Sequence, residues 1–207
     1  TSEQVETKVG NELKGKMKLI RRNGENLLRL INQILDLAKL ESNALKINYV
    51  QGDILAYLRY IAESLHSLAN VQNVLLRVES DQAKIVMDYD PERLLQIVYN
   101  LLSNAIKFTP SGGKVVLRST VDGGRLTEAV IPPPSTVHRP PSIVITVTDT
   151  GVGIPAEDLP HLFDRFYQAN NVEKAKAGGT GIGLALTKEL VKAMGGDISV
   201  ESEVGKG

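Results

Sequence analysis

The sequence has no cysteine, and it has only three histidines among its 207 residues. Without cysteine, disulfide bonds and thiolate metal sites are excluded, which fits a reducing compartment. Charge of neither sign is in excess, because 24 Lys and Arg balance 24 Asp and Glu. This balance gives no reason to expect DNA, RNA or an anionic membrane as a partner. No apolar run approaches the roughly 18 residues that a membrane-spanning helix needs.

The length and composition allow one ordinary domain with an additional element. A hydrophobic content of 42% is enough for a core. The chain starts at Thr1 and not at methionine, so we expect a fragment of a longer protein.

Residues 1–42 are predicted to form one long helix. Apolar residues recur at alternating steps of four and three, with one glycine interrupting them: Leu13, Met17, Ile20, Gly24, Leu27, Ile31, Ile34 and Ala38. This heptad pattern favours a helical bundle that needs partner helices. The alternative is a helix that docks on its own domain.

The remaining chain mixes strand and helix patterns. Strands are expected at 44–50, 74–78, 84–87, 114–120 and 197–201, and a buried strand at 143–148. Helices are expected after Asp53 and Asp90 and over 184–194, and residues 157–167 carry helical spacing. The proline-rich segment 122–142 is expected to be a long hairpin loop.

The helix predicted from Asp90 to Phe108 carries an unusual polar stripe. Gln96, Asn100, Asn104 and Lys107 are spaced by four, four and three residues, so they share one face. Asparagine is a modest helix former, and two of them one turn apart require a reason. A carboxamide oxygen suits Mg²⁺, and a lysine suits a phosphate. The alternative is an ordinary solvent-exposed face.

Two glycine motifs follow this helix in the chain. The first, DTGVGI at 149–154, places a carboxylate at a strand end before a tight turn, where it could accept a hydrogen bond from a ligand or form a local Asx turn. The second, GGTGIGL at 178–184, opens a helix, and the free amides of such a helix end favour an anion. It is not a Walker A loop, because no Gly-Lys-Ser/Thr follows it.

In this order, the motifs resemble those of the catalytic, ATP-binding part of two-component sensor histidine kinases. NLLSNAIKF at 100–108 resembles the N box, DTGVGI the first glycine box, and FDRF at 163–166 the F box. GGTGIGLAL at 178–186 resembles the second glycine box, and Gly205-x-Gly207 the start of the last one.

The resemblance implies an α+β fold: a two-layer sandwich of the Bergerat type, with a mixed sheet packed on three helices and preceded by the long N-terminal helix. Residues 44–207 would be the ATP-binding catalytic domain with its last strand truncated. Residues 1–43 would be the second helix of the dimerisation hairpin, with the first helix absent.

The resemblance also implies roles for individual residues. Asn104 would be the Mg²⁺ ligand and, with Lys107, a catalytic residue, while Asp149 would accept from the adenine amino group. Residues expected around ATP, including a lid over about 155–180, are Asn100, Asn104, Lys107, Phe108, Asp149, Gly151, Gly153, Arg165, Gly179, Thr180, Gly181, Ile182, Gly183 and Leu184. Lys174 and Lys176 are weaker candidates in the same lid.

The implied activity is ATP-dependent phosphorylation of a histidine, with later transfer to an aspartate of a response regulator receiver domain. The implied partners are that receiver domain and a second copy joined through the N-terminal helix, and the implied location is the cytoplasmic part of a membrane-anchored bacterial sensor. None of the three histidines has the family's acceptor context, so we expect the acceptor to be missing. The alternatives are a GHKL-type ATPase, which would need a glutamate base where Asn100 stands, and a non-catalytic nucleotide-binding module.

Overall fold

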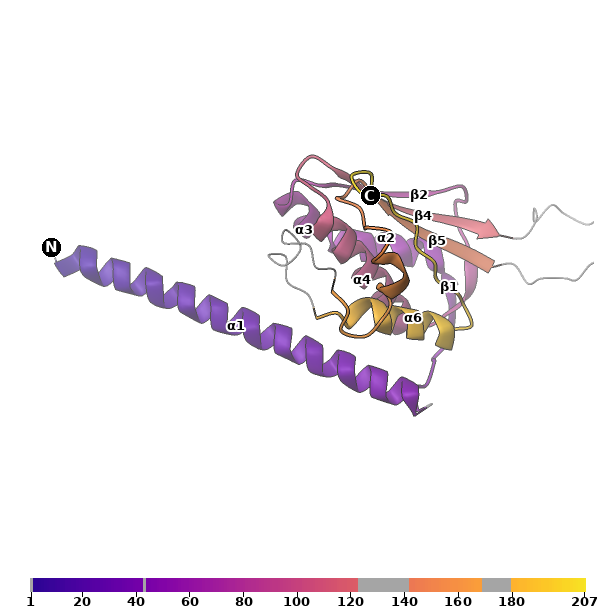
Figure 1. Cartoon of the computed structure of the whole chain (residues 1–207), viewed down its shortest axis with the longest axis horizontal. Helices are drawn as coiled ribbons and strands as arrows, with labels where there is room; N and C mark the ends of the chain where they lie inside the picture. Colours follow the sequence, from indigo (N-terminus) through magenta and orange to yellow (C-terminus); the bar gives the residue numbers. More distant parts are fainter. Residues whose placement is uncertain (1, 43, 123–141, 169–179) are drawn as a thin grey trace, which may run out of the picture.

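The computed structural model describes residues 2–42, 44–122, 142–168 and 180–207. Its first element is α1 (Ser2–Glu41), a 40-residue helix that projects from a compact body formed by the other described residues (Figure 1). The long N-terminal helix is therefore confirmed. Most of the predicted proline-rich loop, residues 123–141, lies outside the described residues.

The strands form a mixed arrangement, as predicted. β1 (Val50–Asp53) pairs antiparallel with β3 (Val86–Tyr89). β4 (Lys114–Asp122) lies between β2 (Leu75–Ser80), to which it is parallel, and β5 (Ser142–Asp149), to which it is antiparallel. The parallel pair is possible because a helix crosses over between β2 and β4.

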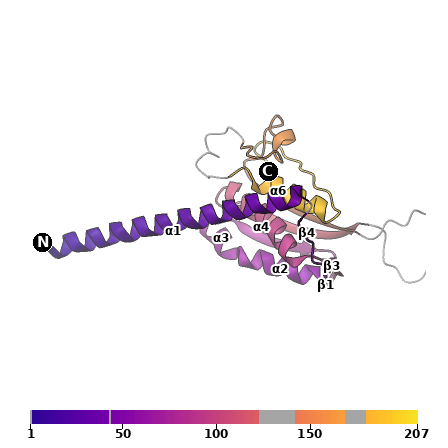
Figure 2. The ribbon, with the colours of Figure 1, turned by 90° about the horizontal axis from the view of Figure 1, so that it is seen from below.

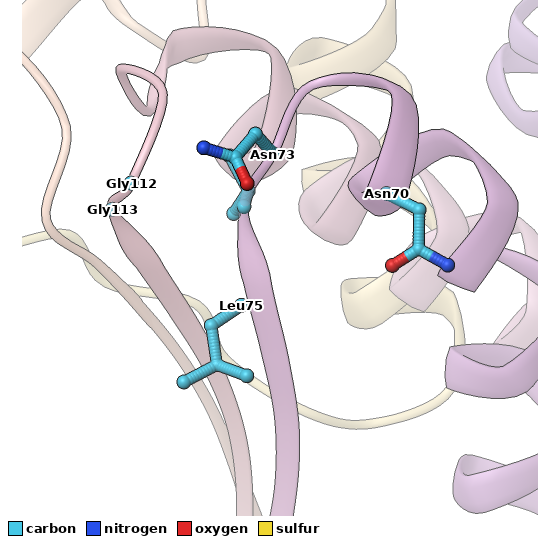
Figure 3. Close-up of a pocket in the computed structure, with 6 residues that line it drawn as sticks. Asn70, Asn73, Leu75, Gly112 and Gly113 are labelled. Carbon is cyan, nitrogen blue, oxygen red and sulfur yellow. The ribbon is translucent and has the colours of Figure 1, made fainter.

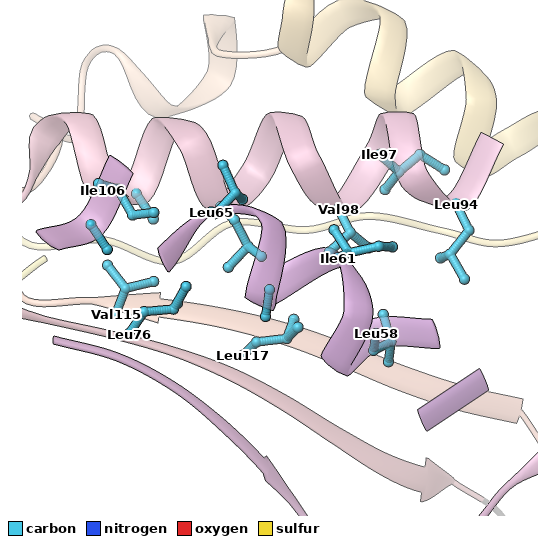
Figure 4. Packing of buried hydrophobic residues seen from close by; sticks show 14 of the residues in the cluster. Leu58, Ile61, Leu65, Leu76, Leu94, Ile97, Val98, Ile106, Val115 and Leu117 are labelled. Atoms are coloured by element: carbon cyan, nitrogen blue, oxygen red, sulfur yellow. The ribbon is translucent and has the colours of Figure 1, made fainter. Parts of the chain in front are cut away.

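A layer of helices covers one face of the β2–β4–β5 sheet, which gives the expected two-layer sandwich, although four helices and not three are found among the described residues. Its members are α2 (Ile54–Ser64), α3 (His66–Val71), α4 (Pro91–Phe108) and α6 (Gly183–Ala193). Figure 4 shows side chains of α2 and α4 meeting those of β2 and β4 in one core. The largest fully buried members include Leu58, Ile61, Leu65, Val98, Leu102, Ile106, Val115 and Leu117. Burial of each such side chain contributes about 1.5–3 kcal/mol.

The helix that carries the polar stripe is fixed at its amino end by one buried carboxylate. Asp90 is 2% exposed, and its Oδ1 accepts a hydrogen bond from the Arg93 amide at 3.1 Å. Its Oδ2 accepts from the Asn48 amide at 2.7 Å, so the same side chain also ties down the segment before β1. Pro91 occupies the first turn, where no amide donor is needed. The predicted start of this helix is confirmed.

Four local predictions are wrong. The first strand begins at Val50 and not at 44, and residues 197–201 have no assigned strand. Residues 157–167 form only the short 3₁₀ helix η1 (Leu159–His161) and turns, because Pro160 interrupts the pattern and Phe166 has a positive φ of 63°. β5 is not fully buried, since half-buried and exposed residues alternate along it.

The carboxyl-terminal part of α1 docks on the compact body. Leu37 is 7% exposed and joins the core, and Leu30 and Leu40 pack against it. Beside them, Asp36 Oδ2 accepts a hydrogen bond from Gln96 Nε2 at 2.9 Å and lies 3.9 Å from Arg93 Nη1. Figure 2 shows this end of α1 running past α4 and α6.

The predicted heptad seam lies on a different side of α1. Leu27, Ile31 and Ile34 are 59%, 45% and 49% exposed, and Leu13, Met17 and Ile20 are also exposed. One face of α1 therefore docks on the domain, as the second alternative states. The seam is left uncovered, and a bundle with partner helices stays a prediction. In the part of the chain that the structure describes, no helix is long and apolar enough to pass through a bilayer.

Candidate functional site

Two residues of the polar stripe of α4 make hydrogen bonds within the protein, and the side chain of a third is open. The helix is continuous from Pro91 to Phe108, so the four side chains lie along one face as predicted. At one end, Gln96 is bound by Asp36 of α1. One turn later, the Asn100 Nδ2 donates to Thr187 Oγ1 of α6 at 2.9 Å. These two contacts hold α1 and α6 against α4.

The next residue of the stripe, Asn104, is half-buried. No hydrogen bond among the described residues involves its side chain. At the end of the helix, the Lys107 Nζ lies 4.7 Å from the centre of the Phe108 ring, a cation–π distance. Asn104 therefore keeps a carboxamide with donor and acceptor capacity available for a ligand.

The first glycine motif packs directly on the carboxyl end of α4. Asp149 Oδ1 accepts a hydrogen bond from the Gly151 amide at 2.8 Å. This bond forms the local Asx turn, one of the two alternatives that the sequence allowed for Asp149. The Val152 amide donates to the Phe108 carbonyl at 3.3 Å. A Cβ atom on Gly151 would lie 2.8 Å from that carbonyl oxygen, so only glycine allows this approach. The turn leaves Asp149 Oδ2 without a bond to this loop.

The last glycine motif, Gly205-x-Gly207, packs against the first one. The Gly205 amide donates to the Val152 carbonyl at 2.9 Å, Gly153 lies against Glu203, and Gly207 lies against the Asp149 backbone. Ser202 joins the two segments, since its Oγ accepts from the Ile154 amide and donates to the Gly207 carbonyl. Ser202 was not among the predicted site residues, because it follows the strand expected at 197–201 and a single serine belongs to no motif.

The second glycine motif leads into α6 beside Asn100. Gly181 has a φ of 67°, and a Cβ on it would lie 2.6 Å from the Phe166 carbonyl carbon. The Phe166 amide donates to the Gly181 carbonyl at 2.9 Å, so the F box and this loop support each other. Phe166 itself is 68% exposed, so its ring does not belong to the core.

The helix that follows begins at Gly183 without a side-chain cap. Its first amides therefore keep their donor capacity for an anion. Ile182 is buried, Thr180 and Leu184 are half-buried, and the Ile182 amide donates to Thr180 Oγ1 at 3.3 Å. Gly179, Lys174 and Lys176, which were also expected near ATP, lie outside the described residues.

Arg165 contacts α1 in this structure. Its guanidinium forms an ion pair with Glu41, the last residue of that helix. In the same region, His161 Nδ1 lies 2.8 Å from Asp164 Oδ2. The hydrogen bond that Tyr167 donates to Asp158, at 2.5 Å, raises the pKa of Tyr167 to about 12. Tyr167 therefore keeps its phenolic proton to a higher pH than an unpaired tyrosine does.

A hollow lies away from these residues. It measures about 320 Å³ and is lined by Asn70, Asn73, Val74, Leu75, Gly112 and Gly113, at the start of β2 (Figure 3). None of the predicted site residues lines it. It has carboxamides and no charged side chain, so it offers no counter-charge to a phosphate.

Two contacts to α4 define the candidate nucleotide site. The second glycine motif reaches the helix at Asn100, because a Cβ on Gly183 would lie 2.5 Å from Asn100 Oδ1. The first glycine motif reaches it at Phe108, two turns later. The separation is about 12 Å along the helix, at about 1.5 Å per residue. Asn104 stands midway between the two contacts.

Comparisons with known proteins show the family and the fold of the chain. Residues 89–207 match the family of histidine kinase-, DNA gyrase B-, and HSP90-like ATPases. The chain is 39% identical over 205 residues to hybrid signal transduction histidine kinase A of Dictyostelium discoideum, covering 98% of this chain and 9% of that protein.

Solved structures show the same fold. Full-length ShkA in complex with AMPPNP is 29% identical, with a TM-score of 0.74 over 93% of this chain and 36% of that one. Histidine kinase ThkA in complex with the response regulator TrrA is 17% identical, with a TM-score of 0.61 over 88% of this chain and 46% of that one. The chain spans less than half the length of each of these relatives. It belongs to the histidine kinase-, DNA gyrase B-, and HSP90-like ATPase family, as the catalytic ATP-binding domain of a sensor histidine kinase.

Proposed function

We propose that this chain binds Mg-ATP between its glycine motifs and transfers the γ-phosphate to a histidine of a dimerisation helix. The observation that carries the proposal is the open side chain of Asn104. Asn100 lies against Gly183 of the second glycine motif and Phe108 against Val152 of the first, and no hydrogen bond among the described residues involves the side chain of Asn104. A carboxamide left open between the Asp149 turn and the amino end of α6, which favours an anion, suits a metal-bound phosphate chain.

The residues of the site fit Mg²⁺ bound together with a nucleotide. Within the described ranges, no group of three carboxylates or histidines gathers to hold a metal. Mg²⁺ commonly takes only one or two protein oxygens and completes its shell with phosphates and water. Asn104 would supply such an oxygen. When bound, the ion would neutralise charge on the phosphate oxygens.

The remaining residues would position the nucleotide. Asp149 has one oxygen engaged by Gly151, and its other oxygen would accept from the adenine amino group, beside Phe108. The amino end of α6, at Gly183, would donate amides to phosphate oxygens, and Lys107 would add a positive charge. Phosphoryl transfer depends mostly on such positioning and charge stabilisation.

The site has no base for water at the position where a GHKL ATPase needs one. Asn100 is a carboxamide whose nitrogen is bound to Thr187, so it cannot take a proton. A neutral histidine needs no such base, because its imidazole has a free lone pair at pH 7. This difference supports a histidine acceptor and slow hydrolysis.

We further propose that none of the three histidines of this chain is the acceptor. His161 is paired with Asp164, His66 lies on the short helix α3 with Nε2 3.5 Å from Glu63, and His138 is outside the described residues. From the acceptor, the phosphate would pass to an aspartate of a response regulator, the kind of partner that the ThkA structure contains. The proposed location is the cytoplasmic side of a membrane-anchored bacterial sensor, which fractionation of the native protein tests.

Incubation with γ-labelled ATP tests the proposed function. We expect no acid-labile label on the chain alone, and label on a separately supplied dimerisation hairpin that carries an acceptor histidine, because the acceptor then docks in line with the γ-phosphate. The control is the same hairpin with that histidine replaced by glutamine. Acid-labile label on His66, His138 or His161, or no label on the hairpin, would contradict the proposal.

Self-association through α1 gives a separate prediction. Leu27, Ile31 and Ile34 are exposed on the seam, and a second copy would cover them. Ile31→Glu should raise the dissociation constant of the dimer by at least about tenfold, because it would bury an unpaired charge. Asn32→Glu adds the same charge beside the seam and should leave association unchanged. Sedimentation equilibrium that shows only monomer for the unmodified chain would refute the dimer.

A further inference from the structure

Thr187 is a polar residue in an otherwise apolar part of α6. It is 1% exposed, and its buried neighbours on the helix are Ala185, Leu186 and Leu190. Its hydroxyl donates to the Gly183 carbonyl at 3.0 Å and accepts from Asn100 Nδ2 at 2.9 Å. A valine of nearly the same volume would fit this core without a polar group to satisfy, so the hydroxyl requires a separate reason.

The two hydrogen bonds of Thr187 determine which way the Asn100 carboxamide is turned. Because the hydroxyl hydrogen is used by the Gly183 carbonyl, the hydroxyl oxygen can only accept, and the Asn100 nitrogen must face it. The carboxamide oxygen is then left against Gly183, where a Cβ would lie 2.5 Å away. This position is the amino end of α6, where the helix amides favour an anion.

We propose that Thr187 is a positioning residue for the metal–nucleotide site. It holds the Asn100 oxygen toward the amino end of α6, one helical turn from Asn104, so that both carboxamide oxygens face the same bound species. There the Asn100 oxygen can accept from a water of the Mg²⁺ shell. This inference rests on the proposed binding of Mg-ATP and adds a residue on a second helix to it.

The test measures the affinity for ATP by calorimetry on the full 207-residue chain, once in Mg²⁺ and once in EDTA. The ratio of the two affinities is the gain that Mg²⁺ gives. Thr187→Val removes the hydroxyl and keeps the volume, and it should reduce this gain by about tenfold, the low end of the range for groups that act on a metal site from outside its ligand shell. Thr187→Ser keeps the hydroxyl and should rescue most of the gain. Should the valine variant not fold, Thr187→Ala is the second hydroxyl-free variant, with the same expectation.

Thr109→Val is a matched control. Thr109 is also buried, and its hydroxyl donates to a carbonyl four residues earlier, that of Ala105, at 2.7 Å, but it does not contact Asn100. This variant should lower the melting temperature without changing the Mg²⁺ gain, which is the result expected of a hydroxyl with a purely structural role. If Thr187 acts through Asn100, Thr187→Val should have no further effect on the gain in an Asn100→Ala background.

The outcomes separate this inference from the proposed function. An unmodified chain that binds ATP equally well in Mg²⁺ and in EDTA would overturn both. A clear Mg²⁺ gain in the unmodified chain that Thr187→Val leaves intact would overturn the positioning role alone. A tenfold loss that serine rescues and that disappears in the Asn100→Ala background would support it.

Discussion

Replacing Asn104 by alanine is expected to weaken Mg-ATP binding by about tenfold to a hundredfold, the range of a lost bond to a charged partner. Binding in EDTA should hardly change, because the lost oxygen is proposed to act on the metal. The fold should not suffer, since no hydrogen bond among the described residues involves this side chain. Alanine is also the better helix former.

Calorimetry in Mg²⁺ and in EDTA, with a thermal melt of each variant, measures this effect. The control is Ser103→Ala on the same helix, where a half-buried hydroxyl donates only to the Asn100 carbonyl, at 3.2 Å. We expect the control to bind Mg-ATP normally. An Asn104→Ala variant that keeps full Mg²⁺ dependence would show that the ion is held elsewhere.

The second large effect is expected at Asp149, where asparagine should weaken ATP binding with or without Mg²⁺. The carboxamide oxygen of the new side chain could still accept from the Gly151 amide, as Asp149 Oδ1 does at 2.8 Å, so the turn should persist. The other oxygen would be replaced by an NH₂ group that faces the adenine amino group, donor against donor. The expected loss is about tenfold to a hundredfold, because a charged acceptor is removed and an unpaired donor is added.

The specificity of this variant is the more discriminating readout. Inosine triphosphate carries an acceptor oxygen where ATP carries the amino group, so Asp149→Asn should weaken its binding much less than that of ATP. Competition between the two nucleotides measures this ratio. An unchanged preference for ATP would mean that Asp149 does not contact the base.

Local chemistry explains which parts of the molecule the sequence predicts. Asp90 and Pro91 start α4, and the spacing of the stripe residues fixes their common face, because both depend on neighbours within a few positions. The glycine turns also carry their own signal. Gly181 has a φ of 67° that other residues rarely adopt. The free amides nearby are those of the first turn of α6, and any helix leaves such amides at its start.

The features that the sequence did not predict depend on contacts between segments far apart in the chain. Asp36 and Gln96 are 60 positions apart, and Asn100 and Thr187 are 87 apart, so no local pattern shows that two residues of the stripe are used within the protein. The strand expected at 197–201 depends on a ladder partner that its sequence does not specify. Arg165 was expected at the nucleotide, and its ion pair with Glu41 depends on how α1 docks.

The most direct test of the account is a calorimetric titration of the unmodified chain with AMPPNP, first in Mg²⁺ and then in EDTA. The account predicts one site per chain, with at least about tenfold tighter binding in Mg²⁺, because the Asn104 oxygen would complete the shell of the metal. Amide chemical shifts recorded on the same samples should change around Asn104, Asp149–Gly153 and Gly181–Gly183. Absence of binding, or shifts confined to the hollow around Asn73 and Gly112, would contradict it.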